Sequence, residues 1–477
     1  MKLIGRDKEI KELETLYTSD KSEFVAVYGR RRVGKTFLVK EVFKKRLSFW
    51  HTGLSPFDRD KTFLLRDQLQ AFYYSLQDYG LQGCQCPKSW LEAFRLLQKL
   101  LTEQDNGSRQ VVFIDELPWM DTARSRFIPA FEYFWNGWAS KRDNILLIVC
   151  GSATSWIENN LINNQGGLYN RLTFEIKLSP FTLKETEEFF LYKNISMSRY
   201  EITTAYMVFG GIPHYLDLFE KGFSVAQNID NLLFAKNAKL KGEFLRLFGS
   251  LFKNADDHIK VVCFLAQRRG GFSRKDILDN TGIKDGGGAT EILKALQESD
   301  FITEYRPFGD NKTIMYKLID PFCITYLQFI DNKHGNDVDF WQKNTLSPKL
   351  NTWRGLAFEL LCFSHIFQIK SKLGISGISS SQSAWLVEQD GKPMSQTDML
   401  IDRSDNVINL CEIKFYNKEF VIDKKYDALL RERIQTLIES IPKTKTVHLT
   451  LIASYGLKQN MYSGIVQQII TLDDLFL

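Results

Sequence analysis

The stretch Gly29-Arg30-Arg31-Arg32-Val33-Gly34-Lys35-Thr36 decides the fold of this chain. An apolar, β-prone run precedes it at residues 24–28, and a run with helical spacing, beginning at Phe37, follows it at residues 37–43. Strand, glycine loop and helix are the context of a phosphate-binding loop, because glycines let N–H groups turn inward beside a positive helix N-terminus. We therefore predict that residues 29–37 bind ATP, with Lys35 at its β- and γ-phosphates and the Thr36 hydroxyl on Mg²⁺.

Polar residues end two further apolar strands. Asp115 and Glu116 follow residues 110–114, so they are expected at the carboxyl edge of a parallel strand, where open α/β sheets bind ligands. Asp115 is predicted to support Mg²⁺, and Glu116 to polarise an attacking water. Ser152 follows residues 145–150. It would face the γ-phosphate if that strand neighbours the phosphate-loop strand, and is otherwise a turn residue.

Composition describes an ordinary globular protein. The chain has 477 residues, for which the length prior suggests about three domains. Its net charge of +5 implies no strong polyanion partner by itself. No signal peptide or long apolar run stands out, so neither export nor a membrane partner is expected. Seven scattered cysteines favour a reduced, cytoplasmic protein.

These motifs resemble the archaeal-type ATPases of the AAA+ and STAND group of P-loop NTPases. The resemblance covers residues 1–330 and implies an ATPase that uses ATP and Mg²⁺. Besides the phosphate loop, it is carried by Gly5-Arg6-Asp7-Lys8-Glu9, Phe113-Ile114-Asp115-Glu116, Gly151-Ser152, Tyr169-Asn170-Arg171, Ser179-Pro180-Phe181 and Gly210-Gly211-Ile212-Pro213-His214-Tyr215-Leu216.

Two predicted contacts to the nucleotide each have an alternative interpretation. By resemblance, Gly211 and Pro213 belong to a helical lid that contacts the nucleotide, although the residues alone indicate only a turn between helices. The lid has no obvious second-sensor arginine. Arg171 is either a contact to nucleotide charge, from the same or a neighbouring subunit of a homo-oligomer, or a surface or salt-bridge residue.

Residues 256–332 have the pattern of a winged helix. Helical runs at 259–265, 274–278 and 290–296 precede two β-rich runs, 301–305 and 314–318. The expected recognition helix carries Glu291, Lys294 and Glu298 and no arginine, which is poor for phosphate contact. A protein-contact or packing role is therefore at least as well supported as DNA binding.

A hairpin near the C-terminus gathers charged residues. The β-rich runs 396–401 and 407–415 flank an Asp/Ser/Asn turn, which places Asp398 almost opposite Glu412. Period-two alternation puts Lys414 on the face of Glu412. Two carboxylates and a lysine could hold Mg²⁺ and activate water for phosphodiester hydrolysis. The alternative is a salt bridge on an exposed sheet face.

With Glu359 on an upstream helix, this hairpin resembles the PD-(D/E)xK nuclease superfamily and the uncharacterised domain that often follows archaeal-type ATPases. The resemblance implies that Asp398 and Glu412 are metal ligands and that Lys414 is catalytic. Thr397 stands where the motif has proline, and Gln435 stands where the superfamily often has glutamine. Nearby cations either attract phosphate or form a solvated helix face: Lys424, Lys425, Arg431 and Arg433.

The predicted architecture is α/β. It consists of a P-loop NTPase (ASCE/AAA+-like) parallel-sheet core at 1–180, a helical lid at 181–255, a winged helix at 256–332 and a restriction-endonuclease-like α/β domain at 345–477. The predicted function is a slowly hydrolysing ATP switch acting on or near DNA, with a metal-dependent nuclease domain left open. The alternative is a signalling or scaffold NTPase whose inactive nuclease-like domain and winged helix bind a partner. A sequence-specific transcription regulator is a third, less supported reading.

Overall fold

A computed structural model describes residues 2–55, 65–252, 254–310, 312–331, 337–389 and 392–477. The chain divides into two compact units. The first comprises Met1–Pro180, Leu245–Ala255 and Glu291–Ser299, and the second comprises Phe181–Phe244, Asp256–Thr290 and Asp300–Leu477. The expected end of the winged helix at residue 332 lies outside the described residues.

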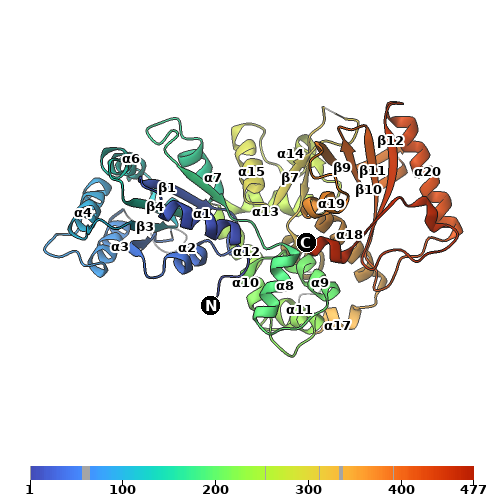
Figure 1. The fold of residues 1–477 in the computed structure, drawn as a ribbon, viewed down its shortest axis with the longest axis horizontal. Coiled ribbons are helices and arrows are strands. Elements are labelled where there is room, and N and C mark those ends of the chain that lie inside the picture. The colour runs from blue at the N-terminus through green and yellow to red at the C-terminus, as the bar shows by residue number, and fades with distance from the viewer. Residues whose placement is uncertain (1, 56–64, 253, 311, 332–336, 390–391) are drawn as a thin grey trace. The chain divides into compact units, whose positions relative to one another are not determined.

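A parallel sheet forms the centre of the first unit (Figure 1). Within the described residues its strand order is β2-β3-β4-β1-β5, with every neighbouring pair parallel. The strand β4 pairs with β1 on one side and β3 on the other, so the carboxyl ends of these three strands lie side by side. The expected α/β fold with a parallel-sheet ATPase core is confirmed. The strands are β1 (Glu23–Tyr28), β2 (Leu47–Thr52), β3 (Gln110–Asp115), β4 (Ile145–Gly151) and β5 (Phe174–Lys177).

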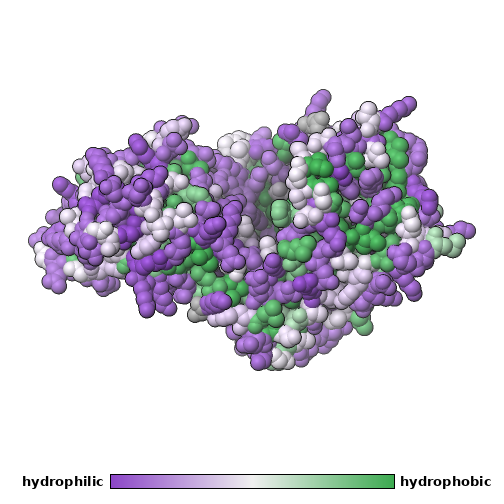
Figure 2. Space-filling model, viewed as in Figure 1, coloured by the Kyte–Doolittle hydropathy of each residue, from purple (hydrophilic) through white to green (hydrophobic). Residues whose placement is uncertain are grey.

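Aromatic side chains fill much of the core of this unit. Phe94 stacks on Phe134 with ring centroids 5.3 Å apart, and Trp90 meets Phe127 edge-on at 5.0 Å. These side chains join the buried residues of the sheet in one hydrophobic cluster. The visible face of the first unit is mostly hydrophilic (Figure 2). Its helices are α1 (Asp7–Tyr17), α2 (Lys35–Phe43), α3 (Leu65–Asp78), α4 (Trp90–Glu103), α5 (Leu117–Met120), α6 (Phe127–Gly137) and α7 (Thr154–Ile157).

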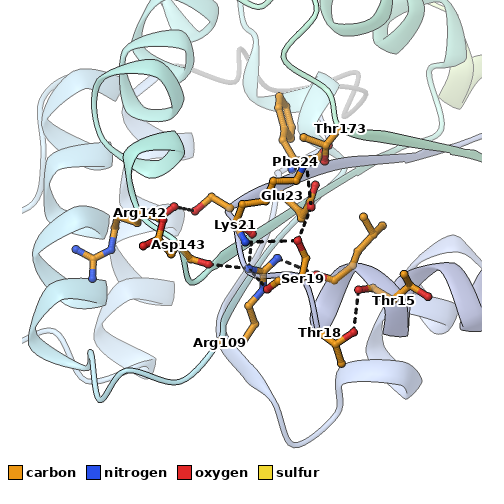
Figure 3. Close-up of polar contacts among 12 residues, drawn as sticks. Thr15, Thr18, Ser19, Lys21, Glu23, Phe24, Arg109, Arg142, Asp143 and Thr173 are labelled. Carbon is orange, nitrogen blue, oxygen red and sulfur yellow. Dashed lines mark hydrogen bonds and ion pairs between the residues drawn. The ribbon is translucent and has the colours of Figure 1, made fainter.

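Arg109 ties together the segments that enter the sheet at its amino edge (Figure 3). Its guanidinium donates to the backbone carbonyl oxygens of Lys21 at 2.6 Å, Asp143 at 3.0 Å and Leu16 at 2.8 Å. Those carbonyls belong to the last turn of α1, to the link from α1 to β1 and to the approach to β4. One side chain thereby fixes the starts of three strands, at the edge opposite the phosphate loop.

The second unit begins with short helices and continues into a small antiparallel sheet. This sheet has the order β6-β8-β7 in the part of the chain that is described. The helix α14 belongs to the same unit, and α12, α13 and α15 have residues in both units. The bounds are α8 (Leu183–Tyr192), α9 (Arg199–Phe209), α10 (Pro213–Asp217), α11 (Val225–Ile229), α12 (Glu243–Leu251), α13 (Ala255–Leu265), β6 (Phe272–Ser273), α14 (Arg274–Thr281), α15 (Gly287–Glu298), β7 (Ile302–Tyr305) and β8 (Met315–Leu318).

The C-terminal part of the second unit is built on a mixed sheet of order β13-β12-β11-β10-β9 in the described residues. The strands β9, β10 and β11 are antiparallel neighbours, whereas β11, β12 and β13 run parallel. The helix α20 packs on this sheet and contributes Leu430 and Leu437 to its core. The bounds are α16 (Pro321–Phe329), α17 (Phe340–Asn344), α18 (Pro348–Ser364), α19 (Ile366–Lys372), β9 (Ser380–Gln389), β10 (Lys392–Arg403), β11 (Val407–Lys414), α20 (Lys424–Ser440), β12 (Thr446–Ala453) and β13 (Gln468–Thr471).

Candidate active site

The loop between β1 and α2 needs glycine at its first position. Gly29 has φ +129°, and a Cβ there would lie 2.5 Å from the carbonyl oxygen of Leu178. Gly34 has φ +93°, but no atom lies within 4 Å of a Cβ built on it. At position 29 both the backbone conformation and the contact with Leu178 exclude a side chain. At position 34 only the backbone conformation disfavours one. Of the other predicted loop residues, Arg30 and Val33 are buried and Arg31, Arg32 and Phe37 are half-buried.

Lys35 lies inside this loop. Its buried ammonium donates to the carbonyl oxygens of Gly29 at 2.8 Å and Arg30 at 2.9 Å, and to Oγ of Ser152 at 3.1 Å. Burial lowers the pKa of Lys35, and the acidic residues Glu116 and Asp115 act against that shift. A positive charge is thus held at a helix N-terminus, where an anionic phosphate is favoured.

Thr36 and Asp115 form a pair of oxygen donors. The Thr36 hydroxyl donates to Oδ2 of Asp115 at 2.9 Å, and Oδ1 of Asp115 accepts the backbone N–H of Glu116 at 3.0 Å. Burial, and then the neighbouring Glu116, raise the pKa of Asp115. Hydroxyl and carboxylate oxygens are the ligands that Mg²⁺ prefers, so this pair fits the ion expected beside nucleotide phosphates.

Ser152 connects Glu116 to Lys35. Its Oγ donates to Oε1 of Glu116 at 2.8 Å, and its backbone N–H donates to Oε2 at 3.1 Å. Glu116 has a left-handed backbone with φ 48°, directly before α5. The pairing of β1 with β4, with Tyr28 opposite Gly151, places Ser152 beside the phosphate loop. The structure therefore brings together Lys35, Thr36, Asp115, Glu116 and Ser152.

Three further residues were predicted to contact the nucleotide. Arg171 is exposed, and its backbone N–H donates to the Leu168 carbonyl in a surface turn. Gly211 and Pro213 belong to the second unit. A Cβ on Gly211 would lie 2.3 Å from the Phe181 carbonyl oxygen, and Pro213 opens α10.

Arg6 supports the loop, a role that loop spacing alone did not reveal. It is buried, with φ 66°, and its Nη2 donates to the carbonyl oxygens of Ser179 at 2.7 Å and Val33 at 3.4 Å. It links the chain's beginning to the loop and to the segment after β5. The sequence feature that could have predicted this role is the position of Arg6 in Gly5-Arg6-Asp7, directly before the first helix.

A second constellation lies on the hairpin of β10 and β11. Met399 pairs with Cys411, which sets Asp398 beside the Glu412 end of β11. Oδ2 of Asp398 accepts the backbone N–H of Ile413 at 2.9 Å. The Lys414 ammonium is 2.6 Å from Oε1 of Glu412 and 3.8 Å from Oδ2 of Asp398. The three predicted side chains therefore converge.

Both carboxylate oxygens of Glu412 are already occupied by cationic or hydroxyl donors. Oε1 accepts from Lys414 and from the Tyr426 hydroxyl, and Oε2 accepts from Arg433 at 2.7 Å. Burial acts to raise the pKa of Glu412, but Lys414 and Arg433 together hold it below its ordinary value. Tyr426 and Arg433 come from α20. Sequence reasoning placed Arg433 only near the site and missed Tyr426.

The arrangement around Glu412 does not fit a resident metal ion. In the part of the chain that the structure describes, no three His, Cys, Asp or Glu side chains are grouped to hold one. Gln435 is exposed and donates to Glu439, away from the hairpin. Arg431 pairs with Asp427, and Lys424 and Lys425 are exposed. The hairpin is thus a closed cluster of matched charges.

Comparisons with known proteins concern the part of the chain that holds the first of these sites. A family model described as an ATPase domain predominantly from Archaea matches residues 3–219. Residues 3–219 are therefore similar to that ATPase domain. An uncharacterised protein of Methanocaldococcus jannaschii is 23% identical over 372 residues, 77% of each chain. An uncharacterised ATP-binding protein of the same organism is 37% identical over 43 residues, 9% of this chain and 73% of the relative.

Solved structures resemble the fold. The Walker-type ATPase of Pyrococcus abyssi has a TM-score of 0.50 at 19% identity, over 69% of this chain and 96% of that one. The Aeropyrum pernix ORC2 protein, solved in ADPNP and ADP complexes, has a TM-score of 0.40 at 15% identity, over 72% and 96%. Across the described residues, no helix combines the length and apolar character that a membrane span needs.

Proposed function

We propose that this protein is an ATP-binding switch that hydrolyses ATP slowly and acts on or near DNA. The observation that carries the proposal is the connected group at the phosphate loop: Lys35 to Ser152 to Glu116, beside the pair Thr36 and Asp115. These are the parts that phosphoryl transfer from ATP to water requires, since catalysis there is mostly positioning and charge stabilisation.

Each residue of the group has a distinct task. Lys35 and the loop N–H groups bind the β- and γ-phosphates. Thr36 and Asp115 would hold Mg²⁺, which supplies charge neutralisation at the phosphates when bound. Glu116 orients the attacking water and accepts its proton, and Ser152 holds the Glu116 carboxylate in place from two donors. Arg171 completes the site from its own or a neighbouring subunit if the protein forms a homo-oligomer.

Lys35→Ala tests the nucleotide site. Isothermal titration with ATP and Mg²⁺ should show binding by the wild-type protein and none by the variant. Lys40→Ala, one turn further along α2, is the matched control and should bind as wild type does. Normal ATP binding by Lys35→Ala would mean that the site is assigned to the wrong residues.

The switch would act through the second unit. We assign residues 181–255 to a helical lid that holds Gly211 and Pro213, residues 256–332 to a winged helix and residues 345–477 to a nuclease-like domain. Nucleotide binding would bias the lid, and the lid would carry the remaining parts with it. Association with DNA that differs between ATP and ADP states would support this reading.

A partner-binding C-terminal domain is favoured over a nuclease by one observation. Glu412 is already neutralised by Lys414 and Arg433, and a metal ion would have to displace them. The test is incubation of plasmid and single-stranded DNA with Mg²⁺ or Mn²⁺, with and without ATP. Cleavage that is lost in Glu412→Ala would establish a nuclease. Intact DNA throughout would leave a switch whose C-terminal domain binds its partner.

A further inference from the structure

Two consecutive arginines occupy a tightly held turn between α13 and β6. Arg268 and Arg269 are both exposed. The turn beneath them is fixed, because Gly271 has φ +67° and a Cβ there would lie 2.0 Å from the Tyr316 carbonyl oxygen. The Tyr305 hydroxyl also donates to the Gly270 carbonyl. The two arginines are therefore consecutive residues of a turn that Gly271 and Tyr305 hold in place.

This turn lies beside the C-terminal charge cluster. The Arg269 guanidinium interacts electrostatically with the carboxyl group of Glu359 on α18, and so does the ammonium of Lys317 on β8. The Lys317 Nζ sits 4.1 Å from the centre of the Phe363 ring, which also belongs to α18. A cation of the small antiparallel sheet and a cation of the turn after α13 thus both lie near α18.

Acidic groups lie near this turn, but none in the described residues pairs directly with the two arginines. Burial, and then the nearby Asp398, raise the pKa of Glu359 to about 8, and burial lowers the pKa of Lys317 to about 8. Hydrogen bonds from Ser273, and then the nearby Arg268, lower the pKa of Asp276, so an ionised acid lies near Arg268. Within the described ranges, Arg268 and Arg269 form no ion pair shorter than 4.0 Å, so their exposed guanidinium groups are open to an anion.

The surfaces that a winged helix usually offers to DNA are less suitable here. On α15, Lys294 is paired with Glu298 at 3.4 Å, which leaves little positive charge for phosphate. Phe308, in the loop between β7 and β8, packs against the hydrophobic core of the C-terminal sheet. The expected wing is therefore held by protein contacts and not available as a free arm.

We propose that the sugar–phosphate backbone of a nucleic acid binds across this turn, with Arg268 and Arg269 as its principal contacts. This inference rests on the proposed function, because that function includes action on or near DNA, and it names the surface that would bind. The guanidinium fork matches two phosphate oxygens at once, and a backbone contact of this kind reads no base sequence.

The test is fluorescence anisotropy of the full-length protein with labelled single-stranded DNA, duplex DNA and single-stranded RNA between 50 and 200 mM salt, a range in which phosphate contacts dominate the salt dependence. The double variant Arg268→Ala/Arg269→Ala should weaken binding about tenfold or more and reduce the slope of log K against log salt by about 1 to 2. Arg268→Lys/Arg269→Lys should keep most of the slope. Lys260→Ala/Lys275→Ala removes two exposed charges from the flanking helices and should bind as wild type.

The outcomes separate the inference from the proposed function. If wild type binds nucleic acid and the arginine variant binds equally well with the same slope, the inference fails and the DNA-linked switch stands. If wild type binds no nucleic acid, both fail. Polyglutamate that displaces the oligonucleotide at equal charge concentration would also overturn the inference, because the surface would then bind anions in general. Thermal unfolding of each variant checks that it is folded.

Discussion

Single residues at the phosphate loop are held by contacts that leave them little freedom. Ser152 donates to both oxygens of Glu116, so the carboxylate plane is fixed before any substrate arrives. The left-handed backbone of Glu116 is an uncommon conformation for a residue with a Cβ, and it aims the side chain toward Ser152 rather than along α5. Such strain at an active site is consistent with a catalytic position.

Replacement of the Glu116 carboxylate should separate ATP binding from ATP hydrolysis. Glu116→Gln keeps the shape and one acceptor oxygen for Ser152 but removes the base, so ATP hydrolysis should fall by about 10² to 10⁴ while ATP binding persists. Phosphate release measures ATP hydrolysis, and calorimetry measures ATP binding. Glu41→Gln, a surface change on α2, is the control. Wild-type turnover by Glu116→Gln would assign the base to another residue.

The two loop glycines offer a matched comparison of clash and strain. Gly29→Ala meets the Leu178 carbonyl and a disfavoured φ, whereas Gly34→Ala meets only a disfavoured φ. Both should lower the free energy of unfolding, Gly34→Ala by about 1 kcal/mol and Gly29→Ala by about 2 to 4 kcal/mol. Chemical denaturation measures both. Equal losses would show that the loop moves away from Leu178 at no cost.

At the scale of elements, Arg109 shows how the sheet's amino edge is assembled. Arg109→Met keeps the aliphatic stem but leaves the carbonyls of Leu16, Lys21 and Asp143 without their donor, so the free energy of unfolding should fall by about 2 to 4 kcal/mol. Arg109→Lys should recover only part of this loss, because one ammonium cannot reach all three carbonyls. Urea denaturation is the measurement, and full recovery by lysine would show that charge alone matters.

The sequence predicted these elements best where a local pattern carries the signal. The phosphate loop, the acidic end of β3 and the hairpin that sets Asp398 beside Glu412 all follow from spacing within a few residues. The partners of Glu412 did not follow, because Arg433 and Tyr426 reach it only through the packing of α20 on the sheet. The support of Arg6 for the loop likewise depends on a contact with Ser179, 173 residues away.

At the scale of the molecule, the second unit joins segments that are far apart in the sequence. Tyr200 on α9 stacks on Phe415, which follows β11, with ring centroids 4.4 Å apart. Arg199 pairs with Asp473 near the C-terminus. The predicted lid helices α8 and α9 therefore belong to the same packed body as the C-terminal sheet. A displacement of these helices would move that sheet with them, which is the coupling that the proposed switch needs.

His365 is a buried contact residue within the second unit, and it should make the stability of that unit depend on pH. Its Nε2 accepts the backbone N–H of Leu183 at 3.1 Å, and its ring meets Tyr206 edge-on. Burial lowers the pKa of His365 to about 4, against 6.5 for the ordinary side chain. The unfolded chain therefore takes up the proton first as the pH falls. The contribution of the neutral His365 ring to the free energy of unfolding is complete above pH 6.5 and is lost as the pH falls from 6.5 to 4. At pH 5 the loss is about 2 kcal/mol.

The matched comparison is with His51, a buried histidine of the first unit whose pKa burial also lowers to about 4. Urea unfolding at pH 7.5 and pH 5.0 should show that His365→Gln, whose amide oxygen can reach the position of Nε2 and accept from Leu183, reduces the acid sensitivity of the second unit only. His51→Asn should do so for the first unit only. Hydrogen exchange of peptides from each unit distinguishes the two, because the nine tryptophans of the chain are spread over both units. Unchanged acid sensitivity in His365→Gln would mean that other groups set the pH response.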